Sequence, residues 1–479
     1  MPESCYVTTS IPYVNARPHV GFALELVLTD AVSRYHRLLG RRTRFQTGTD
    51  ENALKNVVAA REQGVSTQEL VDGNAKLFRE LCTALDASPD DFLRTTEARH
   101  HRAVHRFWQQ LNPGDIYQAW YRGGYCVGCE DFVLDRELVN GLCPEHGVPP
   151  TAVAEKNHFF RLSAYQGRIE ELLVTDRLRV IPDTRKAEVL SFVRGGLQDI
   201  SISRPVSRAG GWGIPVPGDP SQVVYVWIDA LVSYISGLGF GSNEDWRRCW
   251  NEETLKVHVI GKNVWKFHAI YWPAFLLSAG LPLPDHIVVH GFLTEEGRKI
   301  SKSLGNVVDP FYCVRNFGPD AVRYYLLRGA SPFADSDFST ERLRRLYNTD
   351  IANNLGNLVN RLTTLCAQAG QSNPAEHSPP EAPGGYHESW QAYAADEALA
   401  ALWRTLDRVN REIDQARPWN AIRRRDIESV RSHLTRWLSE VRRVAHWLEP
   451  FLPRVASAVR CALGPEPIRP SGVLFPRLQ

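Results

Sequence analysis

The sequence lacks any uninterrupted apolar run that approaches the roughly 20 residues needed to cross a bilayer. Its opening residues, MPESCYVTTS, also lack the basic and then apolar order of a signal peptide. These two absences argue against a membrane-spanning or secreted protein. We therefore expect a cytoplasmic protein with no membrane partner.

An excess of one charge is also missing, since 56 Lys and Arg residues face 54 Asp and Glu residues, for a net charge of +2. This balance does not favour DNA as a partner, and an RNA-binding surface would need local clusters such as Arg423, Arg424 and Arg425. The nine cysteines are an odd number, and three of them lie between positions 126 and 143, which suits a metal site better than a disulfide framework. A chain of 479 residues with 43% hydrophobic residues and a mean hydropathy of −0.30 predicts a folded protein of two to four domains.

Alternating strand and helix patterns open the chain. Residues 5–9 predict a buried strand, and residues 19–39 predict an amphipathic helix. Residues 43–50 predict a second strand, followed by a helix from about Glu51. This order predicts an α/β domain with a Rossmann-like parallel sheet, whose ligand lies at the carboxyl ends of the strands, where Asp50 would sit.

The character of the chain changes twice after this opening. Residues 115–215 predict short aromatic strands and tight turns, whereas 223–230, 255–261 and 286–292 again read as buried strands. After about residue 333 the pattern is helical, in 340–366, 388–416 and 427–463, with a Pro- and Gly-rich loop at 368–387. We therefore expect four parts, with boundaries 1–114, 115–215, 216–332 and 333–479. In this order they are the first half of the catalytic domain, an insertion with the zinc motif, the second half of the catalytic domain, and an all-α domain.

The insertion carries the motif C-x2-C-x13-C-x2-H, formed by Cys126, Cys129, Cys143 and His146. Three thiolates and one imidazole at this spacing can close a tetrahedral zinc site. Because four protein ligands leave no open position, the expected Zn²⁺ is structural and not catalytic.

Two further motifs are ambiguous when each is taken alone. Pro18-His19-Val20-Gly21 stands at the start of the first long helix, where unpaired N–H groups can bind phosphate, but a histidine there is more often a cap. The segment GRKISKSLGN (297–306) can wrap a triphosphate, but by itself it also reads as a solvated basic turn.

Together these features resemble the class I aminoacyl-tRNA synthetases, and most closely the methionyl-tRNA synthetase family. The resemblance covers nearly the whole chain and includes SIPYVNARPHVG, QTGTDEN, YCVGC with CPEHG, ISISRPV, GGWGIPVPG, YVWIDA, VIGK, VHGFL, NNLGNLVNR and the ARPW of residues 416–419. It implies ATP-dependent activation of an amino acid, methionine above all, and transfer of the acyl group to tRNA. It also implies a helical anticodon-binding domain.

The resemblance assigns roles to individual residues. The implied catalytic residues are His19, Asp50, Arg204, Lys299 and Lys302, with Mg²⁺ accompanying ATP. The implied ATP-binding residues are Pro18, His19, Gly21, Lys299, Ser301, Lys302 and Ser303. The implied amino-acid-binding residues are Ser10, Ile11, Tyr13, Asp50, Trp227, Leu231, Tyr234, Val264 and His268, whose aromatic members suit a thioether. The implied anticodon-reading residues are Asn357, Arg361 and Trp419.

Four positions depart from the family pattern. Phe22 replaces the second histidine of the HIGH-like motif, Asn52 replaces a histidine, Leu231 replaces a proline, and Asn263 replaces an aspartate. Three hypotheses follow. The chain is a methionine–tRNA ligase, or a biosynthetic enzyme like the hydrazine-forming synthetases that passes the acyl group to a small amine or hydroxylamine, or a non-catalytic tRNA-binding protein.

Overall fold

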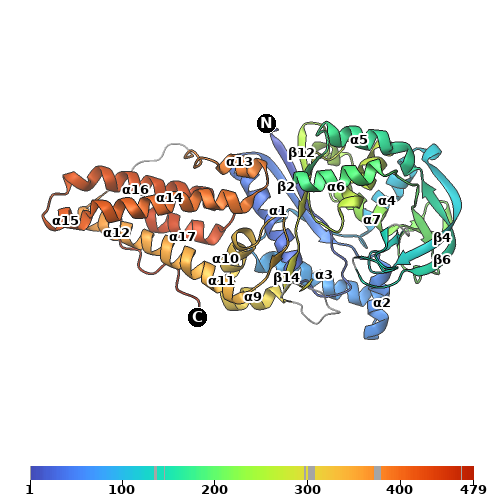
Figure 1. Cartoon of the computed structure of the whole chain (residues 1–479), viewed down its shortest axis with the longest axis horizontal. Helices are drawn as coiled ribbons and strands as arrows, with labels where there is room; N and C mark the ends of the chain where they lie inside the picture. The colour runs from blue at the N-terminus through green and yellow to red at the C-terminus, as the bar shows by residue number, and fades with distance from the viewer. Residues whose placement is uncertain are drawn as a thin grey trace. The chain divides into compact units, whose positions relative to one another are not determined.

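The computed structural model describes residues 2–133, 137–144, 146–295, 298–299, 308–371, 379–464 and 467–479. The chain forms two compact units (Figure 1). The first contains the residues up to Thr29 together with Gly40–Thr83 and Ser88–His290, and the second contains Asp30–Leu39, Ala84–Ala87 and Gly291–Gln479. None of the helices in the described ranges combines the length and the apolar character that crossing a bilayer requires.

A six-stranded parallel sheet forms the centre of the first unit, in the order β3-β2-β1-β12-β13-β7. Its strands are β1 (Ser4–Thr9), β2 (Arg42–Thr49), β3 (Asp91–Arg94), β7 (Arg179–Ile181), β12 (Thr254–Gly261) and β13 (His286–His290). Side chains such as Val257, Val259 and Val289 are fully buried, as expected for strands covered on both faces. The predicted strands at 5–9, 43–50, 255–261 and 286–292 are confirmed within one or two residues at each end.

The strand order reverses between β1 and β12. From β1 the chain moves outward through β2 to β3, and the later strands β12 and β13 extend the sheet on the other side of β1. In open parallel sheets, a ligand crevice lies outside the carboxyl ends of the two strands at such a reversal. The site is therefore expected beyond Thr9 and Gly261.

Helices connect these strands. They are α1 (Val20–Leu38), α2 (Leu54–Gln63), α3 (Thr67–Ala84), α4 (Ala98–Gln110), α7 (Val226–Ser236), the π-helical η5 (Phe267–Tyr271), α8 (Trp272–Ala279), and the short η1 (Pro113–Asp115) and η4 (Asp245–Arg248). The long first helix is confirmed, whereas the second begins at Leu54 and not near Glu51.

The prediction of a strand over 223–230 is wrong. Strand β11 (Asp219–Val224) ends at Val224, and α7 begins two residues later. Every residue of α7 is buried, so its apolar positions show no amphipathic period. A short helix that is apolar all round cannot be told from a buried strand by pattern alone.

The expected insertion at 115–215 contains mainly antiparallel strands. One sheet has the order β5-β4-β6-β8, from β4 (Ile116–Cys126), β5 (Asp131–Val133), β6 (Thr151–Phe160) and β8 (Ile200–Ser201). A second joins β9 (Ser203–Pro205), β10 (Pro215–Val216) and β11. Between β6 and β8 the chain forms η3 (Leu162–Tyr165), α5 (Gln166–Val174), β7 and α6 (Asp183–Arg194), and β7 pairs with β13 of the central sheet. The reading of 115–215 as strands and turns throughout is therefore wrong for 162–194, where α5 and α6 form most of the chain.

The second unit is mainly helical, which confirms the prediction for residues beyond 333. Its helices are α9 (Pro310–Phe317), α10 (Pro319–Tyr324), η7 (Tyr325–Gly329), α11 (Thr340–Leu346), η8 (Tyr347–Gly356), α12 (Asn357–Ala369), α13 (Tyr386–Gln391), α14 (Ala395–Ala416), α15 (Pro418–Arg423), α16 (Glu428–Leu448) and α17 (Pro453–Leu463). Its described strands are β14 (Leu293–Glu295), β15 (Arg298–Lys299) and β16 (Ser336–Asp337). The long helices α12, α14, α16 and α17 pack side by side around buried leucine, valine and tryptophan side chains (Figure 1).

A fully buried arginine ties this helical unit together. Arg323 pairs with Asp30 at 2.8 Å, and its guanidinium also donates to the carbonyl oxygens of Leu85, Pro450 and Phe451. All of the guanidinium nitrogens are thereby satisfied, so the buried charge is compensated.

Candidate active site and metal centre

The start of α1 shows why a histidine and a glycine occur two residues apart. The Gly21 N–H donates to His19 Nδ1 at 3.0 Å, so Nε2 carries the imidazole proton in this arrangement. A Cβ on Gly21 would lie 2.7 Å from the His19 ring, which only glycine avoids. His19 is exposed, whereas Pro18 is buried. The histidine is therefore a helix cap, and its role toward phosphate stays a prediction.

Two buried charged residues, Asp50 and Arg204, and the half-buried Tyr13 form a polar group at the loop after β1. Tyr13 forms a β-bridge with Asp50, and the Asp50 N–H donates to the Pro12 carbonyl at 2.8 Å. Arg204, from β9, is 4% exposed and Asp50 is 1% exposed. Burial raises the pKa of the Tyr13 hydroxyl, and Asp50 raises it further while Arg204 opposes it, so the three groups are electrostatic neighbours.

Each of these residues has a buried polar atom without a hydrogen-bond partner in the described structure. They are Asp50 Oδ1, Tyr13 Oη, and Arg204 Nε and one terminal nitrogen. Burial raises the pKa of the Asp50 carboxyl well above its ordinary value, and the carboxylates of Asp229 and Glu130 add to the shift. Buried unpaired donors and acceptors are rare in native proteins and need a reason. An acceptor and donors grouped in this way can take the ammonium and carboxylate of an amino acid.

An uncharged aromatic wall adjoins this polar group. Trp227 stacks on Phe267 with ring centroids 3.5 Å apart and an interplanar angle of 8°, and Tyr13 meets Trp227 edge-on at 6.1 Å. Sequence reasoning missed Phe267, although its position directly before His268 is a usable signal.

Two more of the expected pocket residues form a satisfied pair. The Val264 carbonyl accepts from His268 Nδ1 at 2.9 Å, so His268 Nε2 accepts from the Tyr234 hydroxyl at 2.6 Å. Burial lowers the pKa of His268 to about 4, which leaves the imidazole neutral at physiological pH. The wall can therefore bind an apolar or thioether side chain without meeting a charge.

The remaining expected pocket residues have defined surroundings. The Ser10 hydroxyl donates to Glu25 at 2.6 Å, and Glu25 also accepts from His290 Nε2 at 2.9 Å when that nitrogen carries a proton. Ile11 packs against the central core, and Leu231 is buried within α7.

The structure accommodates two of the family departures by different means. Phe22 is buried and packs edge-on against Phe78 of α3, with ring centroids 5.1 Å apart, so this side chain is a core contact. The Asn52 amide donates to Asp229 at 2.8 Å, and His100 contacts the other oxygen of that carboxylate at 2.5 Å. Asn263 is exposed after β12.

The lysine-rich segment is only partly described. The backbone of Lys299 belongs to β15, which pairs with β14. Ser301, Lys302 and Ser303 lie outside the described residues, so their assigned roles stay a prediction.

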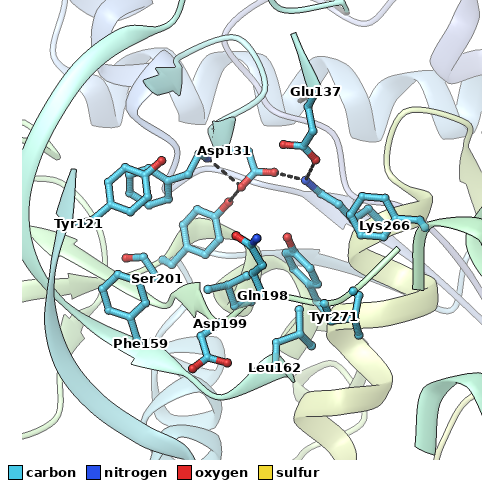
Figure 2. Close-up of a pocket in the computed structure, with 16 residues that line it drawn as sticks. Tyr121, Asp131, Glu137, Phe159, Leu162, Gln198, Asp199, Ser201, Lys266 and Tyr271 are labelled. Atoms are coloured by element: carbon cyan, nitrogen blue, oxygen red, sulfur yellow. Dashed lines mark hydrogen bonds and ion pairs between the residues drawn. The ribbon is translucent and has the colours of Figure 1, made fainter. Parts of the chain in front are cut away.

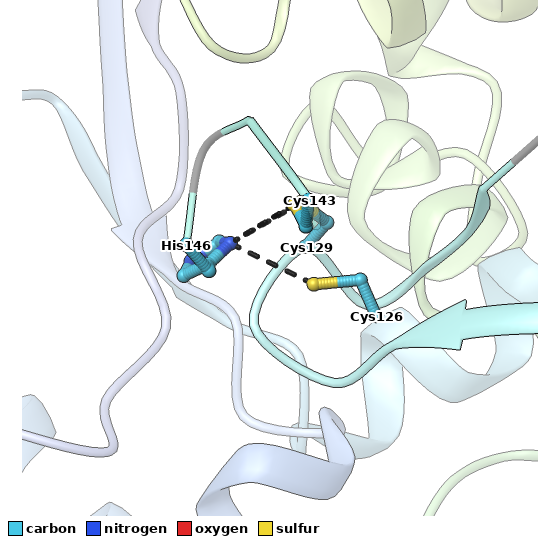
Figure 3. Close-up of side chains that lie close together, drawn as sticks. All are labelled: Cys126, Cys129, Cys143 and His146. Carbon is cyan, nitrogen blue, oxygen red and sulfur yellow. Dashed lines mark hydrogen bonds between the residues drawn. The ribbon is translucent and has the colours of Figure 1, made fainter. Parts of the chain in front are cut away.

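The expected metal ligands lie together (Figure 3). The Nδ1 atom of His146 lies 3.7, 3.3 and 3.8 Å from the sulfurs of Cys126, Cys129 and Cys143, and the last two sulfurs are 3.5 Å apart. Tetrahedral zinc with normal bond lengths places its sulfur and nitrogen ligands about 3.5–3.8 Å apart, so the donors present fit this metal. A Cβ on Gly128 would lie 2.4 Å from the His146 ring. This position between the first two cysteines therefore requires glycine, which has no side chain.

A small cavity is lined by residues of the insertion and of the central domain (Figure 2). It measures about 70 Å³, and its lining includes Asp131, Tyr225 and Lys266. Asp131 accepts from the Tyr225 hydroxyl at 2.8 Å and from Lys266 Nζ at 2.6 Å. Asp131 thus fixes the Tyr225 ring through its hydroxyl. The centroid of this ring lies 4.8 Å from the guanidinium carbon of Arg204.

In the second unit, two of the three expected RNA contacts share a polar groove. Asn357 and Arg361 lie one turn apart on α12 and face Asn410 and Asp414 of α14. Arg361 donates to Asp414 at 2.6 Å and to Asn410 at 2.5 Å. Trp419 is half-buried in the first turn of α15, which packs against α12 and α16.

Known proteins resemble this chain along most of its length. The family model described as "tRNA synthetases class I (M)" matches residues 5–150 and 146–363. A methionine–tRNA ligase of Brucella suis biovar 1 is 39% identical over 477 residues, 95% of this chain and 90% of that protein, and one of Mycobacterium bovis is 41% identical over 485 residues, 96% and 92%.

Solved structures agree with this result. The structure of Mycobacterium tuberculosis methionyl-tRNA synthetase in complex with methionyl-adenylate superposes with a TM-score of 0.89 at 40% identity, covering 99% of this chain and 97% of that one. Shared sequence and shared fold lead to one conclusion. The chain belongs to the class I aminoacyl-tRNA synthetases, in their methionyl-tRNA synthetase family.

Proposed function

We propose that this protein activates methionine with ATP as methionyl-adenylate and transfers the methionyl group to tRNA. One observation carries the proposal: buried atoms of Asp50, Tyr13 and Arg204 that have no partner among the described residues adjoin a neutral aromatic wall. This combination matches a zwitterion with an apolar, polarizable side chain. Relatives of similar length bear the name methionine–tRNA ligase, and a structural relative holds methionyl-adenylate.

The residues have separate tasks in the activation step. Asp50 accepts from the substrate ammonium, and the open N–H groups of Arg204 orient the carboxylate for in-line attack on the α-phosphate. His19, presenting Nε2–H at the helix start, donates to the charge that develops on this phosphate, with Pro18 and Gly21 shaping the turn. Lys302, assisted by Lys299 and flanked by Ser301 and Ser303, neutralises the leaving pyrophosphate. Mg²⁺ supplies charge neutralisation on the triphosphate when ATP is bound.

The pocket residues select the substrate side chain. Tyr13, Trp227, Tyr234 and His268 form its aromatic wall, and Ser10, Ile11, Leu231 and Val264 complete its lining. The zinc held by Cys126, Cys129, Cys143 and His146 is structural, because four protein ligands fill a tetrahedral shell.

Recognition of tRNA falls to residues 333–479, the anticodon-binding part in the proposed division 1–114, 115–215, 216–332 and 333–479. Asn357 and Arg361 supply hydrogen bonds to base edges from one groove, and Trp419 supplies a stacking surface. A cytoplasmic location fits this activity, and the nine cysteines form no disulfide in the described structure, which suits a reducing compartment.

Pyrophosphate exchange tests the first half of the proposal. Wild-type protein should exchange labelled pyrophosphate into ATP with methionine and far less with each other common amino acid. Lys302→Ala should lower this exchange about a hundredfold or more and leave methionine binding nearly unchanged. Exchange that does not depend on methionine would overturn the assigned substrate.

Charging of tRNA tests the second half. Methionine-dependent exchange together with acylation of methionine tRNA supports the full proposal. Robust exchange without acylation of any tRNA would favour the biosynthetic alternative, in which a small amine or hydroxylamine takes the acyl group. Binding of tRNA without exchange would favour a non-catalytic tRNA-binding protein.

A further inference from the structure

Four consecutive residues at the first zinc knuckle each contact a residue beside the candidate amino-acid site. The Gly128 carbonyl accepts from Lys55 Nζ at 2.6 Å, and the Cys129 carbonyl accepts from Trp227 Nε1 at 3.4 Å. Glu130 contacts Arg204, and Asp131 accepts from Tyr225. Two of these acceptors are backbone atoms, so only Glu130 and Asp131 contribute through their side chains.

Three properties of Glu130 are unusual for a residue with a purely structural role. It is fully buried, its backbone has φ +55°, and it is a charged residue inside the first unit. A non-glycine residue in this left-handed region costs free energy that the surrounding structure must offset. Such strain, together with a buried charge, is commonly found where a site needs one particular side-chain position.

The contacts of Glu130 are directed at one side of Arg204. One carboxylate oxygen lies 3.2 Å from a terminal nitrogen of Arg204 and also accepts from the Tyr125 hydroxyl. The other oxygen accepts from the Lys55 backbone N–H at 2.8 Å. The rings of Tyr125 and Tyr225 each lie 4.8 Å from the Arg204 guanidinium carbon. The guanidinium is thus confined by two rings, by the Tyr125 hydroxyl, to which it donates, and by one carboxylate.

This confinement decides which Arg204 atoms are available. The nitrogen that faces Glu130 is occupied, whereas Nε and the other terminal nitrogen are buried without a partner in the described structure. If Glu130 were absent, only the Tyr125 hydroxyl would still accept from that nitrogen, and the guanidinium could rotate. Its free edge would then no longer face the substrate carboxylate.

We propose that Glu130 is a positioning residue for amino-acid recognition. It holds Arg204 so that the free edge of the guanidinium faces the substrate carboxylate, and it links this geometry to the zinc knuckle through the adjacent Cys129. This inference rests on the proposed function, because it assumes that Arg204 meets the carboxylate of an amino acid.

Steady-state exchange with Glu130→Ala and Glu130→Gln tests the proposal. Glu130→Ala should raise the KM for methionine about thirtyfold or more, the usual cost of removing one partner of a buried charge pair, while the KM for ATP changes less than about threefold. Glu130→Gln should recover part of the activity, since its amide oxygen still accepts from Arg204 and Tyr125, whereas its NH2 group cannot accept from the Lys55 backbone N–H. Zinc content should stay at about one per chain in both variants, as expected for an intact four-ligand site.

Methioninol provides the readout that a structural defect would not produce. It keeps the ammonium and the thioether but lacks the carboxylate. In Glu130→Ala its binding should therefore weaken at least about tenfold less than that of methionine, because the impaired interaction involves only the carboxylate. Equal weakening of both ligands, or a change in the KM for ATP as large as that for methionine, would overturn the inference.

Controls separate this outcome from a failure of the proposed function. Glu137→Gln removes a carboxylate of the same insertion that lies 3.9 Å from Lys266, and it should leave both KM values unchanged. If wild-type protein shows no methionine-dependent exchange, the proposed function fails before Glu130 is tested. If wild-type protein is active and Glu130→Ala behaves like Glu137→Gln, the proposed function stands and the role of Glu130 is refuted.

Discussion

The amino-acid end of the candidate site and the start of α1 differ in whether their polar atoms have hydrogen-bond partners. At the first, Asp50, Tyr13 and Arg204 keep buried atoms without partners in the described structure. At the second, Phe22 occupies a position that is polar in the family and packs against Phe78, while His19 Nδ1 is occupied by the Gly21 N–H. An unpaired buried polar group is costly, so a chain that no longer bound its ligand would be expected to fill such positions. The proposed function therefore expects amino-acid recognition to depend on the unpartnered atoms at the first end, and it expects no phosphate contact from Phe22.

The largest expected effect is at the amino-acid end. Asp50→Asn removes the carboxylate that receives the substrate ammonium, and exchange should fall about a hundredfold to a thousandfold. Circular dichroism and zinc content should match the wild type, since Asn is isosteric. Exchange close to that of the wild type would show that the unpartnered oxygen is not a substrate contact.

Trp419→Ala tests recognition of RNA separately from activation. Losing one base stack costs about 1–3 kcal/mol, so acylation of methionine tRNA should fall about tenfold to a hundredfold. Pyrophosphate exchange should stay unchanged, because that reaction does not involve tRNA. A parallel loss of exchange would mean that the substitution damages the fold and not an RNA contact.

Phe22→His tests the other side of the comparison. If the site is a methionine enzyme with one donor missing, a restored imidazole should raise exchange by about tenfold, a conservative value for one transition-state donor. The same substitution gives up packing against Phe78, so a lower melting temperature is also expected. Unchanged or lower exchange in a folded variant would indicate that the crevice is adapted to another substrate.

The smallest expected effect is the loss of folding stability at acidic pH that protonation of His268 causes, and it is absent at neutral pH. The pKa of His268 is lowered by burial from 6.5 to about 4, so the unfolded chain binds one more proton than the folded chain between these values. The stability should therefore be fully present above the unfolded pKa of 6.5 and should decrease as the pH falls toward 4, by up to about 3 kcal/mol for this group.

Urea unfolding of wild type and His268→Gln at several pH values measures this contribution. The variant should show a shallower loss of stability across the same range, by about one proton. Identical pH slopes for the two proteins would show that His268 titrates normally in the folded state.

Much of the fold follows from local patterns. The strands β1, β2, β12 and β13 and the helix α1 are long enough for apolar spacing to identify them. The zinc ligands are equally readable, because C-x2-C and C-x2-H close small loops whose geometry depends on few other residues. The strand β7 and the helix α7 escaped prediction, since the first is very short and the second is buried all round.

Composition and motif spacing by themselves determined that this chain has a parallel α/β domain, a four-ligand metal site and a helical C-terminal part. They also identified Asp50, His19 and Arg204 as candidates, through resemblance to a family. Only the tertiary structure decided that Phe22 packs on Phe78, that Phe267 stacks on Trp227, and that Glu130 restrains one edge of Arg204. These contacts join residues far apart in sequence, and the availability of a polar atom depends on every neighbour that folding brings to it.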